Sequence, residues 1–78
     1  MLSPQQVVDT YFLEARHMLL EIAALLDRHD AAVARTGGDG GPAAAAKLAT
    51  VREALDVLGR QPATGERTVA LLELFAKV

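Results

Sequence analysis

The long stretch between Pro4 and Gly37 contains neither glycine nor proline, and this feature constrains the fold most strongly. Ser3 is a favourable N-cap, Pro4 suits the first helical position, and Gln6 stands where a capping box requires Glu or Gln. Ala and Leu, the strongest helix formers, are the commonest residues of the stretch. The sequence therefore predicts one long helix over residues 4–35, about 45–50 Å in length at 1.5 Å per residue.

Apolar residues recur along this predicted helix at alternating intervals of four and three residues. The members of this main seam are Val8, Phe12, Ala15, Leu19, Ile22, Leu26, His29 and Val33. Such spacing is a heptad pattern, and only His29 interrupts it. We expect the main seam to face the rest of the chain.

Two further stripes lie on the same helix. The second stripe alternates apolar and polar groups and comprises Val7, Tyr11, Glu14, Met18, Glu21, Leu25 and Arg28. The third stripe lies nearly opposite the main seam at 100° per residue and comprises Leu13, His17, Leu20 and Ala24. A surface helix normally presents one apolar face, so the extra stripes call for extra contacts.

The C-terminal segment strengthens this argument, because apolar residues cover most of its circumference. We therefore expect self-association, in the form of a twofold homodimer of the four-helix-bundle type. The expected interface residues are Leu13, Leu20, Ala24, Leu71 and Leu74. The alternative is a monomer whose extra apolar surface meets another protein.

Glycines divide the remainder of the chain. Four glycines within residues 36–41 predict a turn, after which Pro42 opens a helix over residues 42–58. A second break precedes a third helix over residues 65–77, which Thr64 caps unless Pro62 starts it earlier. Helices two and three then lie end to end against the first helix, or fold back as a three-helix bundle.

The predicted fold is all-α, with the long N-terminal helix packed against two shorter helices in a single domain, residues 1–78. A chain this small usually needs a disulfide, a metal or a partner chain for stability. The sequence has no cysteine, which excludes disulfides and thiolate metal sites. The remaining sources of stability are close helix packing, self-association, or a metal held by His and carboxylates.

Charge and hydropathy exclude two classes of partner. The net charge is −2 and the chain has no basic block, which argues against a nucleic-acid binder. No uninterrupted apolar run approaches the roughly 20 residues that span a bilayer, so we expect no membrane partner. Nor does the N-terminus have the charged-then-apolar order of a signal peptide, and a cytoplasmic location is the expectation.

One polar cluster has residue types suited to metal binding. Glu14, His17 and Glu21 fall within about 60° of one another on a helical wheel, between the second and third stripes. Carboxylates and imidazoles bind iron, manganese or zinc. Two chains would bring together four carboxylates and two histidines.

Glu14 and His17 also form a Glu-x-x-His pair, which resembles the metal-binding pair of ferritin-like di-iron proteins. The resemblance covers these two residues, with Glu21 as a third ligand. In that family the lone glutamates come from separate helices, whereas Glu21 shares a helix with the pair. Glu53 or Asp56 on the second predicted helix are substitutes, although nothing in the sequence fixes which way they face.

The competing interpretation is a polar interface or a solvated ridge. Glu14 then pairs with Arg16 or Lys77, and Glu21 pairs with Arg28 across a dimer. Two hypotheses follow. The first is a non-enzymatic helical interaction and oligomerisation module. The second is a carboxylate–histidine metalloprotein with oxidase or ferroxidase-like activity, whose site lies on the long helix across a dimer.

Overall fold

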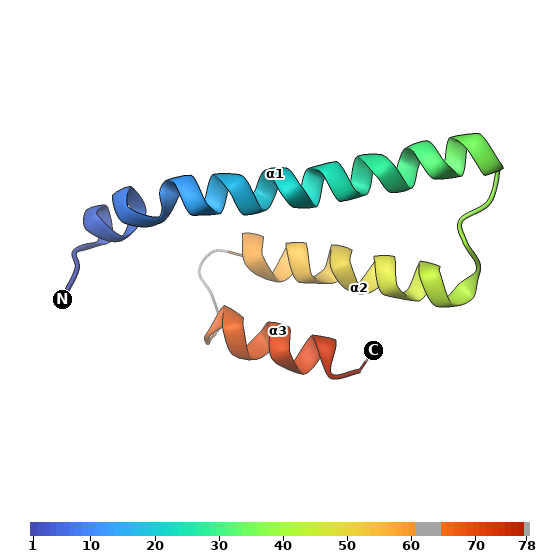
Figure 1. Ribbon diagram of the computed structural model, residues 1–78. Helices are drawn as coiled ribbons and strands as arrows, with labels where there is room; N and C mark the ends of the chain where they lie inside the picture. Colours follow the sequence, from blue (N-terminus) through green and yellow to red (C-terminus); the bar gives the residue numbers. More distant parts are fainter. Residues whose placement is uncertain (61–64, 78) are drawn as a thin grey trace. The chain divides into compact units, whose positions relative to one another are not determined.

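The computed structural model describes residues 1–60 and 65–77, and these residues form three helices without a strand. The helices are α1 (Pro4–Thr36), α2 (Pro42–Gly59) and α3 (Arg67–Phe75) (Figure 1). The all-α prediction is confirmed. The chain divides into two compact units, residues 1–37 and residues 38–78. That the two units form a single domain stays a prediction.

The first unit consists of α1, which is capped at both ends, and the cap at its start is the predicted one. The Ser3 backbone N–H donates to Gln6 Oε1 (2.8 Å), and the Gln6 N–H donates to Ser3 Oγ (3.1 Å), which completes a capping box. At the other end Gly37 adopts φ +77° and donates its N–H to the Val33 carbonyl at 2.7 Å. The helix ends one residue later than predicted, because this left-handed glycine closes it after Thr36.

The second unit is a helical hairpin in which α3 folds back along α2 (Figure 1). This contact excludes the end-to-end arrangement of the two shorter helices, because α2 and α3 lie side by side. The three-helix bundle stays a prediction. Ala54 of α2 is the one buried residue in the described part of the chain, at 7% exposure. Its methyl group leaves room for the neighbouring helix to approach closely.

Neither helix of the hairpin has a side-chain cap at its start. The N-cap of α2 is Gly41, whose N–H binds Asp39 Oδ1 (3.0 Å) in the preceding turn. The N-cap of α3 is Glu66, so this helix is shorter than predicted at both ends. Thr64 and Pro62, the predicted starts of the third helix, lie outside the described residues.

One polar contact joins the end of α2 to the start of α3. Arg67, the first residue of α3, donates from Nη2 to the carbonyl of Arg60 at 2.6 Å. Arg60 is the C-cap of α2, so the guanidinium satisfies a carbonyl that the helix itself leaves free. The positive charge also interacts favourably with the negative end of the helix dipole.

None of the described helices is long and apolar enough to cross a lipid bilayer.

Candidate functional site

The predicted polar cluster lies on the middle of α1. His17 and Glu21 are one helical turn apart, and His17 Nε2 lies 3.2 Å from Glu21 Oε1. The side chains are 73% and 70% exposed, so water solvates both groups in a single chain. A surface pair of this kind contributes only about 0.2–1 kcal/mol to stability, and only when the imidazole is protonated.

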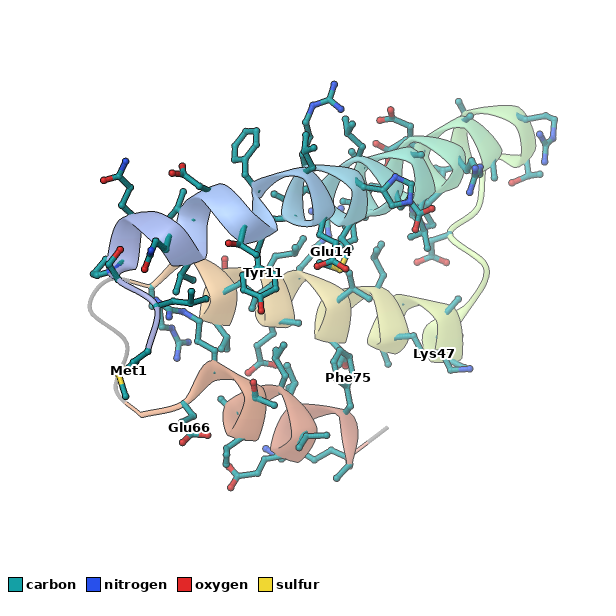
Figure 2. All side chains as sticks on the ribbon, turned by 60° about the vertical axis from the view of Figure 1, so that its left-hand side comes forward. Met1, Tyr11, Glu14, Lys47, Glu66 and Phe75 are labelled. Carbon is teal, nitrogen blue, oxygen red and sulfur yellow. The ribbon has the colours of Figure 1, made fainter. Side chains whose placement is uncertain are left out.

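Glu14, the third member of the predicted cluster, lies on the same side of α1 as Tyr11 (Figure 2). The Glu14 side chain is exposed, and among the described residues no ion pair links it to His17 or Glu21. Within residues 1–60 and 65–77, no three side chains among His, Cys, Asp and Glu come close enough to hold one metal ion. Glu53 is exposed on α2, in the other unit. The polar cluster of α1 therefore does not by itself form a three-ligand metal centre.

The predicted interface residues of α1 flank this pair. Leu13 and Leu20 are 75% and 54% exposed, although each has a fully apolar side chain. Ala24, one turn beyond Leu20, is half-buried. The third stripe is thus an accessible apolar strip along α1.

On α3 the two predicted interface residues differ from their neighbours. Leu71 and Leu74 are half-buried, whereas Val69, Leu72 and Phe75 are exposed. The exposed residues recur every three positions and form a second apolar strip. Leu71 and Leu74, the predicted interface residues, are thus the more covered pair of α3 within one chain.

The main seam of α1 is also incompletely covered. Its N-terminal members Val8, Phe12 and Leu19 are exposed, whereas Ile22 and Leu26 are half-buried. The whole of α1 contains no buried residue. The expectation that the seam faces the other helices stays a prediction.

His29, the polar residue of the main seam, has a covered ring. Its side chain is 30% exposed, and Nδ1 makes no hydrogen bond to any described residue. The nearest carboxylate oxygen, Asp30 Oδ1, lies at 3.5 Å from that nitrogen on the adjacent residue of the helix. This spacing is too long for a hydrogen bond.

An open depression on α1 was not expected from the sequence. It is lined by Glu21, Ala24, Leu25 and Arg28. These are positions i, i+3, i+4 and i+7, the four residues that form a hole for a side chain of a facing helix in knobs-into-holes packing. The small Ala24 beside three longer side chains is the sequence signal that could have located it.

No known protein family, characterised protein or solved structure matches this chain.

Proposed function

We propose that this chain is a helical self-association module, which works as a homodimer of the four-helix-bundle type and has no catalytic chemistry of its own. The observation that carries this proposal is the exposure of α1. A helix of 33 residues carries the main seam and two further stripes with apolar members, and it buries none of its residues. Contiguous apolar surface of this kind marks an interaction site.

Exposed leucines of α1 would contribute favourable free energy to association if a dimer covers them. Burying one Leu side chain contributes about 1.5–3 kcal/mol. Leu13, Leu20 and Leu25 are all at least half exposed, so covering them in a dimer gains several times that amount. In a twofold dimer every such residue counts twice, because both copies use the same surface.

The architecture supports a bundle. Two copies of α1 supply the long helices, and each hairpin adds the shorter helix α2 with α3 alongside it. Facing helices at small crossing angles bury the apolar stripes that one chain leaves exposed. A different protein that offers an apolar helix is the rival occupant, and the test below decides between them.

The pairing of His17 with Glu21 favours a second candidate function. One imidazole and one carboxylate converge on the same helix face, so a dimer with two such pairs in contact has four ligands for iron, manganese or zinc. Adding Glu14 of each copy would supply two more carboxylates. This second proposal is a carboxylate–histidine metalloprotein with oxidase or ferroxidase-like activity.

Native mass spectrometry and light scattering of the full chain test both proposals. The protein is purified without chelators and without a metal-affinity tag. We expect a dimer at micromolar concentration, and we expect Leu20→Glu to weaken it by about 30-fold or more, because each copy then places a carboxylate in an apolar contact. Gln5→Glu is the control, since it adds the same charge near the start of α1 outside the three stripes.

A parent protein that stays monomeric at all concentrations contradicts self-association. A Leu20→Glu dimer as stable as the parent removes the third stripe from the interface. Transition metal that copurifies with the dimer, and that Glu14→Ala and His17→Ala abolish, would favour the metalloprotein.

A further inference from the structure

Four charged residues of α1 stand on one line of the helix surface, seven residues apart. They are Glu14, Glu21, Arg28 and Arg35, and all four are exposed. Seven residues make almost two complete turns, so the side chains point in nearly the same direction. The order along the line is acid, acid, base, base. The N-terminal half of this line is therefore negative and the C-terminal half is positive.

This order is self-complementary in one orientation only. Glu21 and Arg28 lie at equal distances on either side of the junction between Ala24 and Leu25, and so do Glu14 and Arg35. A second helix that runs antiparallel about a twofold axis at this junction brings opposite charges together. A parallel partner in register places like charges opposite each other instead, which is unfavourable.

We infer that α1 pairs antiparallel with α1 of a second copy, with the twofold axis between Ala24 and Leu25. Each Glu14 then faces Arg35 of the partner copy, and each Glu21 faces Arg28 of the partner copy. The symmetry yields four ion pairs. This inference rests on the proposed self-association and adds the orientation and register of the two chains.

The depression on α1 lies on this axis and fits the same register. Its lining residues Glu21, Ala24, Leu25 and Arg28 are centred on the junction between Ala24 and Leu25. Leu25 is half exposed, and in this register it faces Ala24 of the second copy. Leu25 of each chain thus fills the hole of the other, where the small Ala24 leaves space.

Residues beside the charged line allow close approach of the two helices. In this register His17 of one copy lies opposite Ala32 of the other, and Met18 lies opposite Ala31. Each long side chain meets an alanine, so large and small residues alternate across the interface as dense packing requires.

The dimeric metal site needs a different register. Its twofold axis lies between His17 and Met18, which brings Glu14 next to Glu21 of the second copy and gathers four carboxylates without an arginine. In the inferred register the two Glu14 residues are separated by about 31 Å along the axis, at 1.5 Å per residue. One dimer cannot satisfy both arrangements.

Cysteine cross-linking of the full chain distinguishes these arrangements, because the natural sequence contains no cysteine. His17→Cys and Ala32→Cys chains, which differ in mass, are mixed and oxidised, and the products are identified by mass spectrometry. We expect the mixed disulfide between the two variants as the main product. Each variant alone should give little, since identical positions are about 22 Å apart along the axis and a disulfide spans Cα atoms only about 4.4–6.8 Å apart.

The other products overturn the inference in recognisable ways. Disulfides within both single variants, without the mixed product, indicate parallel helices. A disulfide within the His17→Cys variant alone indicates the axis between His17 and Met18 that the metal site requires. In both cases the dimer persists and only the inferred orientation or register is wrong, whereas a monomeric parent protein contradicts the proposed function itself.

Charge exchange tests the ion pairs independently of cysteine. Arg28→Glu places two Glu–Glu contacts in the dimer, and we expect its dissociation constant to rise about 10-fold or more at low salt. Combining Glu21→Arg with Arg28→Glu restores opposite charges and should return the dissociation constant to within about threefold of the parent value. Arg16→Glu is the control, since it makes the same charge change away from the charged line. A double variant as weak as Arg28→Glu alone, or an unaffected single variant, overturns the inference.

Discussion

Different interactions stabilise the helices of the two units of this protein. The helix α1 has a capping box at its start and a left-handed glycine at its end, yet it buries no residue. The helices of the hairpin start without side-chain caps, but they contact each other and bury Ala54. Local signals therefore define α1, whereas tertiary contact defines the hairpin.

The difference matters most for α3. A helix of nine residues is only marginally stable by itself in water, since nucleation costs more than so few hydrogen bonds return. The stabilisation that the local sequence of α3 lacks comes from the half-buried Leu71 and Leu74 and from the hydrogen bond of Arg67 to the Arg60 carbonyl. The longer α1 has the helix-forming signals, and the single chain leaves much of its apolar surface exposed. This contrast is why we assign self-association to α1.

The largest effect is expected from a substitution that disrupts the hairpin and leaves α1 intact. Ala54→Asp puts a charge at the buried position of α2, and we expect a loss of about 2–4 kcal/mol in the free energy of unfolding. Ala49→Asp, at an exposed position of the same helix, should cost only about 0.5 kcal/mol through helix propensity. Urea unfolding gives both values.

Hydrogen exchange of the same variants then sharpens the comparison. Ala54→Asp should reduce amide protection in α2 and α3 more than in α1. Equal loss of protection along the whole chain would show that the units unfold together, against the separate origins proposed here.

A smaller effect is expected at the C-terminal cap of α1. Gly37→Ala forces alanine into φ +77°, which costs about 1–2 kcal/mol, although no atom would crowd the added methyl group. Gly38→Ala, whose backbone does not have a positive φ, should be neutral or stabilise by up to about 1 kcal/mol. Thermal unfolding followed by circular dichroism compares the two. Equal stability would mean that the left-handed cap does not contribute.

The smallest effect concerns the polar link of the hairpin. Arg67→Ala removes the hydrogen bond to the Arg60 carbonyl, and we expect a loss of about 1 kcal/mol or less, because the contact is exposed. Arg52→Ala, on the exposed surface of α2, is the matched control and should be neutral. Urea unfolding gives the free energy of unfolding of both variants. If Arg67→Ala loses no more than Arg52→Ala, apolar packing alone stabilises α3.

The candidate site shows where sequence reasoning reached its limit. The helical wheel placed Glu14, His17 and Glu21 on one face, and the structure joins His17 with Glu21 at 3.2 Å. Within one chain both groups are exposed, and the periodicity of a single helix cannot determine whether a partner chain covers them. The hole around Ala24 was not predicted either. A stripe of residues identifies one face of a helix, but it does not show where a short side chain among longer ones leaves a depression.

The sequence by itself determined α1, since the capping box, the absence of internal glycine and proline, and Gly37 are all local features. It also determined the order of charges along α1, on which the inferred dimer depends. Only the tertiary structure decided that α3 folds back on α2, that Ala54 is the buried residue, and that Arg67 reaches Arg60. The physical reason is that these contacts join residues distant in the chain, and the local pattern of each helix permits several ways of packing the same apolar surface.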